Sequence, residues 1–416
     1  MSDKIKIFTI SDHPLSPSGV GTQTKYIIEG MLKTGKYQFV SFGGAIKHPT
    51  HDPQKTEQWG EDWIIWPVDG YGNQDMVRAM IRQQKPDILW FMTDPRFYDW
   101  LWAIENEIRA HVPMVYYHVW DNYPYPTFNR KFYLSNDHVA CISRLTHDIV
   151  ETVAPEVDSS YVPHAVDPDV FKPHPTEEVK SWRQSKQLDD KFVCFWNSRN
   201  ARRKQSGTLI WWFKEFLDKV GHDKACLIMH TDVKDQHGQD LEAIIHELGL
   251  TNGEVLFSRE KVSASDLSGM YNMADVTICI SDAEGFGLST LESMSSGTPI
   301  IVTMTGGLQD QVTDGEKFFG VGIEPVSKAV IGSQQVPFIY EDRLSKEDFV
   351  DALTQIYEMT PEARRELGME ARTWSEERFG FDKFVQTWDD LFTSIYDKKG
   401  SWETRQGYQP YEMRTF

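Results

Sequence analysis

The sequence predicts an α/β protein made of two Rossmann-like, doubly wound domains that face a central crevice. Its 416 residues fit two domains of about 200 residues each, given roughly 100–200 residues per domain as a general expectation. Short apolar runs alternate with stretches of helical periodicity, which indicates mostly parallel sheets covered by helices. This alternation pauses once and then resumes, so we expect the chain to form two such units.

The first half of the chain contains a series of short runs rich in β-branched and aromatic residues. They predict strands at residues 4–10, 38–44, 62–68, 87–93, 113–119, 138–143 and 159–164. The intervening stretches include 22–35 and 98–112, both of which have the apolar spacing of a helix. We therefore expect a first domain over residues 1–175.

A polar stretch with two prolines, residues 172–189, suits a hinge between the domains. Beyond it, a second series of apolar runs predicts strands at 191–197, 226–232, 254–258, 275–281 and 299–304. Amphipathic helices are expected at 346–359 and 381–399. The second domain should cover 189–380, the last helix (about 381–398) should join the first domain, and a polar tail should occupy 400–416.

Composition narrows the possible functions and the compartment. The formal net charge of -19 argues against a broad basic surface for nucleic acid, although the cluster Arg199 to Lys204 is a local exception. Each of the four cysteines lies in a short apolar run without metal-ligand spacing, which is typical of buried thiols in a reducing compartment. No run approaches the ~18 apolar residues of a membrane-spanning helix, so we expect a cytoplasmic protein.

The loops that follow the predicted strands are where ligands bind in doubly wound folds. The loop after the first strand carries Gly19 and Gly21 just before a helix, where backbone N–H groups can approach an anion. The third glycine of the dinucleotide fingerprint is missing, and a plain tight turn explains the pair equally well. Both interpretations stay open at this point.

Residues 281–299, SDAEGFGLSTLESMSSGTP, offer a more specific pattern. A buried strand leads into a Gly-Phe-Gly turn, and a helix begins after it. The N–H groups of Gly287, Leu288, Ser289 and Thr290 can hold a phosphate, while Glu284 and Glu292 accept hydrogen bonds from hydroxyls on either side. A phosphate flanked by polyols indicates a nucleotide sugar. The alternative is that Ser289 and Glu292 form a capping box.

This stretch resembles the signature of the family-four retaining glycosyltransferases of the GT-B fold, in which two glutamates spaced E-x7-E contact the donor. Other blocks resemble the family in the same order, at residues 162–173, 197–207, 270–287 and 305–312. The aromatic block 116–133 is loosely similar to phage-borne relatives. His164 and Ala165 depart from the usual asparagine and glycine at the exit from the first domain.

The resemblance implies a role for each matching residue. Glu284 would contact the donor sugar, Glu292 the ribose, and Arg199 and Lys204 the diphosphate. His118 would lie near the transferred sugar. The remaining donor contacts would come from Gly19, Gly21 and the turn, comprising Phe286, Gly287, Leu288, Ser289 and Thr290. The donor would be a nucleoside diphosphate sugar, most simply a UDP-sugar.

The resemblance also implies metal-independent catalysis, although residues 167–169 imitate a metal-binding D-x-D. Two carboxylates would suit a glycoside hydrolase as well, but that interpretation leaves Arg199 and Lys204 unused. A nucleotide-sugar 2-epimerase has the same architecture and needs no acceptor. Transfer with retention of a hexosyl group is the function that the sequence favours.

The acceptor is open between two classes. Trp120, Asp121 and Tyr123 lie in the aromatic block beside His118 and are the candidate acceptor residues. Aromatic faces stack on sugar rings and on extruded bases alike. The acceptor is therefore a saccharide or other small hydroxyl compound, or a hydroxymethylated pyrimidine base in DNA.

Overall fold

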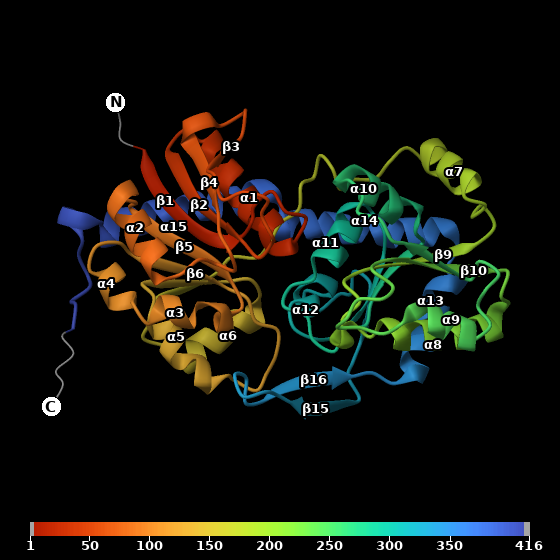
Figure 1. Ribbon diagram of the computed structural model, residues 1–416. Helices are drawn as coiled ribbons and strands as arrows, with labels where there is room; N and C mark the ends of the chain where they lie inside the picture. The colour runs from red at the N-terminus through yellow and green to blue at the C-terminus, as the bar shows by residue number, and fades with distance from the viewer. Residues whose placement is uncertain (1–3, 412–416) are drawn as a thin grey trace.

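The computed structural model describes residues 4–411 and confirms the α/β fold with two parallel sheets, each covered by helices on both faces (Figure 1). Every predicted strand forms. In each sheet the order of strands reverses beside the first strand, as expected for doubly wound units. No helix among the described residues is long and apolar enough to cross a membrane.

The first sheet has the order β3-β4-β2-β1-β5-β6-β7-β8, and all of its pairs are parallel except β3 with β4. Its strands are β1 (Ile5–Asp12), β2 (Tyr37–Gly44), β3 (Gln54–Lys55), β4 (Trp63–Pro67), β5 (Ile88–Thr93), β6 (Met114–His118), β7 (His138–Cys141) and β8 (Ser159–Tyr161). Strand β3 is too short to leave a pattern in the sequence, and it was not predicted.

The second sheet has the order β11-β10-β9-β12-β13-β14 and is parallel throughout. Its strands are β9 (Phe192–Asn197), β10 (Ala225–His230), β11 (Val255–Ser258), β12 (Val276–Cys279), β13 (Ile300–Thr303) and β14 (Val321–Ile323). The short edge strand β14 is an addition to the predicted set.

Helices connect the strands and close the chain. They are α1 (Gly19–Lys33), α2 (Gln74–Gln84), α3 (Asp99–Trp102), α4 (Glu105–Arg109), α5 (Arg130–Leu134), α6 (Arg144–Val153), α7 (Thr176–Ser185), α8 (Ser206–Val220), α9 (Leu241–Glu247), α10 (Ala264–Met273), α11 (Leu288–Ser295), α12 (Leu308–Val312), α13 (Lys346–Glu358), α14 (Pro361–Phe379) and α15 (Phe381–Lys399). Several begin at a side-chain cap, as where Ser345 accepts from the Asp348 N–H at 3.0 Å before α13.

The prediction of one continuous helix over 98–112 was wrong. The chain instead forms α3 and α4, with a break at Ala103 and Ile104. Leu101, Trp102 and Ile104 are all buried in the first domain's core.

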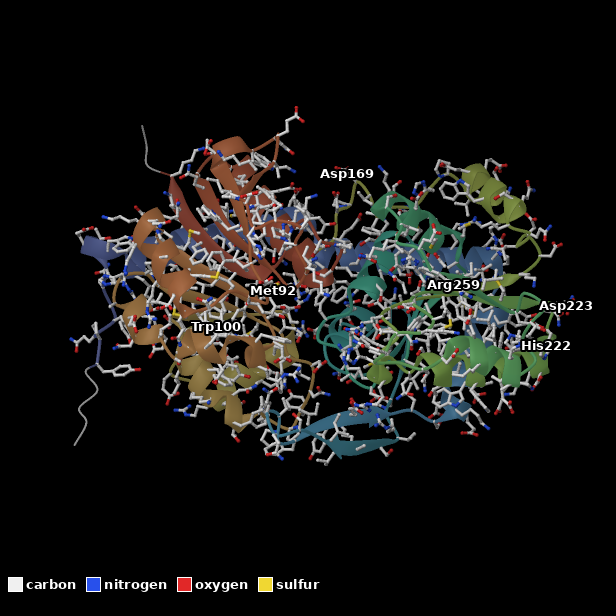
Figure 2. All side chains as sticks on the ribbon, in the orientation of Figure 1. Met92, Trp100, Asp169, His222, Asp223 and Arg259 are labelled. Carbon is white, nitrogen blue, oxygen red and sulfur yellow. The ribbon has the colours of Figure 1, made fainter. Side chains whose placement is uncertain are left out.

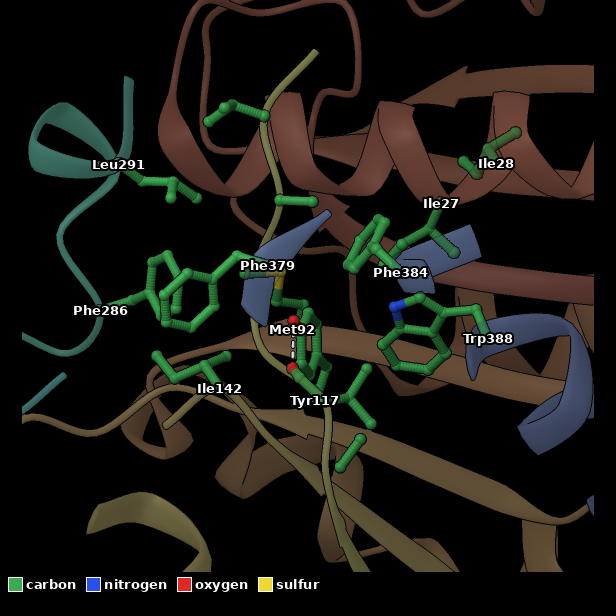
Figure 3. Packing of buried hydrophobic residues seen from close by; sticks show 14 of the residues in the cluster. Ile27, Ile28, Met92, Tyr117, Ile142, Phe286, Leu291, Phe379, Phe384 and Trp388 are labelled. Atoms are coloured by element: carbon green, nitrogen blue, oxygen red, sulfur yellow. Dashed lines mark hydrogen bonds between the residues drawn. The ribbon is translucent and has the colours of Figure 1, made fainter. Parts of the chain in front are cut away.

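The last helix, α15, follows α14 directly in the sequence but packs on the first domain. Trp388 of α15 is fully buried against Tyr117, with ring centroids 4.8 Å apart (Figure 3). Its ring also lies 6.0 Å from that of Trp90. Tyr37 Oη donates to the Asp389 carboxylate at 2.6 Å. The exact domain boundaries stay a prediction, but α15 supplies part of the first domain's core.

The residues after α15 continue along the same domain. Trp402 N–H donates to His111 O at 2.7 Å, and Arg405 Nη2 donates to a buried Asp137 oxygen at 2.6 Å. The described part of the tail, up to residue 411, is therefore held by specific polar contacts to the first domain.

A two-stranded hairpin, β15 (Ser327–Ile331) and β16 (Ile339–Arg343), was not predicted. It leaves the second domain and runs beside both domains along one side of the molecule (Figure 1). At its base, Asp342 N–H donates to Asp282 O at 2.8 Å. Toward its tip, Val336 is buried in the first domain's core and Tyr340 N–H donates to Tyr123 O at 2.6 Å. The hairpin therefore bridges the two domains.

Candidate functional site

The Gly-Phe-Gly turn after β12 leaves the first N–H groups of α11 without partners. Gly287 has a φ of 94°, and a Cβ there would lie 2.5 Å from Leu308, so only glycine fits. Gln311 Nε2 donates to the carbonyls of Phe286 and Gly287 at 2.7 and 2.9 Å. Among the described residues, none accepts from the N–H groups of residues 288–290. These N–H groups therefore keep the hydrogen-bonding capacity that an anion uses at a helix N-terminus.

The capping-box alternative is wrong. The residue that precedes α11 is Gly287, and the helix begins without a side-chain cap. Ser289 already lies in the first turn, so its hydroxyl is in the wrong position to cap. Glu292 instead accepts from Tyr271 Oη at 2.7 Å, and Asn197 Nδ2 donates to the same phenol at 2.8 Å.

Glu292 lies in a pocket that favours its neutral form. Burial raises the pKa of Glu292 to about 7, although the hydrogen bond from Tyr271 lowers it in part. The carboxyl group therefore changes charge near neutral pH. A ligand hydroxyl that donates to this carboxylate would favour its ionised form.

In contrast to Glu292, the surroundings of Glu284 favour its ionised form. Its carboxylate forms an ion pair with Lys204 Nζ, and both side chains are largely buried. Burial acts to raise the pKa of Glu284, but the charges of Lys204 and Arg203 outweigh it and hold the pKa below its ordinary value. Glu284 is thus an ionised acceptor.

Arg203, which precedes Lys204 in the chain, also contacts the loop that carries Glu284. Its Nη1 donates to Ala283 O at 2.9 Å, and its Nε lies 3.8 Å from Asp121 Oδ2 of the first domain. Arg199, the arginine chosen from the sequence, points elsewhere. It donates to Asp235 at 2.6 Å and its side chain is 61% exposed. Arg203 stands directly before Lys204 in the same basic cluster, and that adjacency was the signal that could have identified it.

The two glycines of the first domain have different roles. A Cβ on Gly19 would lie 3.0 Å from Leu288 Cδ1, so the start of α1 approaches the start of α11. A Cβ on Gly21 would meet His13 O at 2.6 Å, and the Gly21 N–H already donates to Ser18 Oγ. Gly19 therefore borders the anion site, while Gly21 is required by its own loop.

His118, which the resemblance places near the transferred sugar, is fully buried at the end of β6. Its Nε2 lies 3.2 Å from Tyr133 Oη, and its Nδ1 has no partner within the described chain. Burial lowers the pKa of His118 to about 3, so the imidazole is neutral. The Tyr133 ring, from α5, meets the imidazole edge to face at 4.9 Å between ring centroids.

The candidate acceptor residues follow β6, and two of them, Trp120 and Asp121, lie beside the Gly-Phe-Gly turn. A Cβ on Gly285 would lie 3.3 Å from Trp120 O and 3.9 Å from Asp121 Cβ. Trp120 is buried, with its Nε1 donating to Asn122 O at 3.0 Å. Burial raises the pKa of Asp121 despite the nearby Arg203 charge. Tyr123 meets Tyr125 edge to face at 5.0 Å.

Phe286 and Thr290, two residues predicted to bind the nucleotide sugar, stabilise the turn with their side chains. Phe286 is buried beside Phe379, with ring centroids 5.5 Å apart (Figure 3). Its ring also meets that of His164 at 5.0 Å. Thr290 is buried and donates from Oγ1, 2.6 Å from Gln311 Oε1. What these two residues can offer a ligand is their backbone, whereas Leu288 and Ser289 are partly exposed.

The D-x-D imitation at 167–169 lies outside this site. Asp169 is exposed on the loop between the two domains (Figure 2), and its N–H donates to Asp167 Oδ1 at 2.9 Å. The two residues form a local turn. Among the described residues, the three side chains close enough to share a metal ion are His147, Asp148 and Glu151 on α6, two of them exposed.

Comparisons with known proteins show which protein family this sequence resembles. Residues 178–374 match the family model described as glycosyl transferases group 1. The chain is 37% identical over 76 residues to a D-inositol 3-phosphate glycosyltransferase from an Arthrobacter species, and this match spans only 18% of either chain.

Solved structures resemble the whole fold. Sucrose-phosphate synthase from Thermosynechococcus elongatus has a TM-score of 0.75 at 15% identity, covering 95% of this chain and 100% of its own. HepE from Anabaena, in complex with UDP and glucose, has a TM-score of 0.70 at 15% identity, covering 94% of this chain and 100% of its own. These likenesses show the fold, two Rossmann-like domains in the GT-B arrangement.

Proposed function

Because residues 178–374 belong to the group 1 glycosyl transferases and the chain has the GT-B fold, we propose that the protein is a retaining hexosyltransferase. It moves a hexosyl group from a nucleoside diphosphate sugar to the hydroxyl of a saccharide or another small compound. The observation that carries this proposal is the uncapped start of α11, flanked by Glu284 and Glu292. UDP-sugar is the simplest donor, since the similar Anabaena HepE binds UDP and glucose.

The donor's charges and hydroxyls each have a partner in this arrangement. The diphosphate accepts from the N–H groups at the start of α11, and Lys204 and Arg203 balance its charge. Glu284 accepts from hydroxyls of the hexose, and Glu292 accepts from the ribose. Lys204 is paired with Glu284, so it would link the sugar-binding carboxylate to the diphosphate.

Retention follows if the acceptor hydroxyl attacks from the face that the diphosphate leaves. A diphosphate oxygen then takes the acceptor proton, and no carboxylate base is required. The two cations stabilise the leaving group, so the reaction needs no metal ion. His118 is neutral and fully buried, so its Nδ1 would reach a hexose hydroxyl only after a local rearrangement that exposes this atom.

A second acceptor class is a hydroxymethylated pyrimidine base in DNA. The observation that favours it is the aromatic pair beside the site, in which Tyr125 is 41% exposed and meets Tyr123 at 5.0 Å. An extruded base stacks on such a surface. The high negative charge of the chain weighs against binding of the duplex itself.

A transfer assay tests the proposal. The protein is incubated with UDP-glucose and either a panel of saccharides or DNA containing hydroxymethylated pyrimidines, and products are identified by mass spectrometry and NMR. We expect an α-linked glucoside and free UDP, with the same rate when a chelator is added. A β-linked product would contradict retention. Conversion of the donor to its 2-epimer without any acceptor would instead identify an epimerase.

A further inference from the structure

The hairpin β15–β16 connects the two domains without a continuous backbone between them. The chain itself passes from one domain to the other after β8 and again between α14 and α15. The hairpin runs along the lower side of the molecule (Figure 1), whereas the connecting loop with Asp169 lies on the upper side (Figure 2). A rotation about the covalent connections that opens the crevice would therefore pull the hairpin away from one of the domains.

The root of the hairpin, residues 341–343, is held by buried charges of the second domain. Glu341 forms ion pairs with Arg202 and Arg343 at 2.5 and 2.9 Å, and its side chain is only 2% exposed. Arg343 also pairs with Asp282 Oδ2 at 2.5 Å, and this carboxylate is buried as well. Because a buried charge that loses its partner is strongly destabilising, these pairs keep the hairpin on the second domain.

The same root is bonded to the loop that carries Lys204. The Asp282 N–H donates to Arg203 O at 2.8 Å, and Asp282 O accepts from the Asp342 N–H at 2.8 Å. Gln205 Nε2 donates to Asp282 Oδ2 at 2.6 Å. Arg203 and Gln205 are the two neighbours of Lys204 in the chain. The hairpin is thus fixed to one of the loops that carry the candidate donor-binding charges.

The outer part of the hairpin contacts the first domain through weaker interactions. Val336 is 6% exposed and lies in the first domain's core. The Phe338 ring meets Phe128 edge to face at 5.3 Å, and the Tyr340 N–H donates to Tyr123 O at 2.6 Å. These contacts involve no charged side chain. Since neutral contacts are less costly to break than buried ion pairs, the hairpin should separate on this side.

The first-domain loop that the hairpin holds is the loop beside the Gly-Phe-Gly turn. Asn122 Nδ2 donates to Tyr340 O, which adds to the bond between Tyr340 N–H and Tyr123 O. In the same loop, Trp120 O would lie 3.3 Å from a Cβ on Gly285 of the turn. The hairpin therefore fixes the position of this loop relative to the candidate donor site.

We propose that β15–β16 is a clasp between the domains. It stays attached to the second domain, holds the first domain at residues 122–123 while the crevice is closed, and releases that loop when the crevice opens. In the closed state it also positions the loop 120–123 for an acceptor. This last consequence rests on the proposed glycosyl transfer, whereas the attachment and release of the domains do not.

Pulsed electron paramagnetic resonance on the full chain tests the clasp. The four natural cysteines are buried, so spin labels can be attached at Lys131→Cys on α5 and Lys219→Cys on α8, one in each domain. Val336→Asp places a charge in the first domain's core, and we expect it to add a population with a longer distance between the labels. Val330→Asp, at a valine of the same hairpin that is 68% exposed, should leave the distance distribution unchanged.

A longer distance with Val336→Asp and not with Val330→Asp supports the clasp. The same distribution in both variants and the unmodified hairpin overturns it, because the hairpin would then not hold the domains together. Thermal unfolding shows whether Val336→Asp still folds. If it does not, Phe338→Ala removes the contact with Phe128 at an exposed position, and the longer distance should appear with this variant. Its absence there also overturns the proposal.

The transfer assay tests the positioning of the acceptor loop. Val336→Asp should raise KM for the acceptor at least several-fold and leave KM for UDP-glucose nearly unchanged, since the loop with Lys204 keeps its contacts. An equal rise in both constants would overturn this positioning role. Absence of transfer by the unmodified protein would contradict the proposed function, and the label distances would still decide whether the hairpin is a clasp.

Discussion

At the scale of single residues, the basic cluster before α8 separates into side chains with different surroundings. Lys204 is largely buried beside Glu284, whereas Arg199 extends into solvent and pairs with Asp235. A charge inside a water-poor site acts on the leaving diphosphate more strongly than an exposed one. We therefore expect the cluster to contribute unequally to turnover.

Lys204→Ala should lower kcat on the order of 10²-fold, since it removes a preorganised charge from the leaving group. Arg203→Ala should cause a comparable loss. Arg199→Ala is the matched control from the same cluster, and its exposed position predicts a much smaller loss. Steady-state kinetics with a saturating donor measures each. Normal turnover of Lys204→Ala would remove this residue from the site.

The raised pKa of Glu292 predicts how the free energy of unfolding depends on pH. Its pKa is about 7 in the folded protein and near 4.5 when unfolded, so the folded state holds the proton more tightly between these values. The free energy of unfolding should therefore fall as pH rises through this window. Glu292→Gln removes the dependence. Relative to this variant, the unmodified protein should lose on the order of 1–3 kcal/mol between pH 5 and 8.

Denaturant titrations of both proteins at several pH values measure the difference between their free energies of unfolding. The contributions of the other titrating groups are common to both proteins and cancel in this difference. The unmodified protein should lose stability relative to Glu292→Gln as pH rises. A difference that stays constant across the range would show that Glu292 titrates normally in the folded state.

At the scale of elements, most strands of the two parallel sheets were predictable because they are short apolar runs bounded by polar residues, whereas β3 and β14 were not predicted. The hairpin β15–β16 was not, because its strands alternate only weakly and are held by residues distant in sequence, such as Tyr123 and Asp282. Likewise, the sequence places Glu284 and Glu292 on either side of one turn. The sequence does not reveal which arginine of the cluster 199–204 donates to Ala283 O, because that depends on the conformation of the loop.

Hydrogen exchange tests the hairpin's attachment to the first domain. Tyr340 N–H donates to Tyr123 O, and Asn122 Nδ2 donates to Tyr340 O. Asn122→Ala removes the second contact, so the Tyr340 amide should exchange at least several-fold faster. The Val326 amide, which donates to Arg343 O at the hairpin's base, is the internal control and should keep its rate. Equal acceleration of both amides would indicate general loosening instead.

At the scale of the whole molecule, α15 joins the end of the chain to the first domain. Trp388 is fully buried among aromatic side chains there. Trp388→Ala should lower the free energy of unfolding by about 3–5 kcal/mol, as for other large core truncations. Trp211→Ala, at a tryptophan that is 47% exposed, should cost far less. Denaturant unfolding compares the two, and similar losses would contradict the role assigned to α15.

The position of α15 and the residues after it has a consequence for biosynthesis. The ribosome releases β1 to β8 first, yet Trp388, Trp402 and Arg405, which complete that domain, emerge after the whole second domain. Domains generally fold as they emerge, the N-terminal one first. In this protein the second domain can complete its folding first, while the first domain still exposes the apolar surface that α15 will cover. The nascent first domain is thus the part of this chain that a chaperone would hold longest.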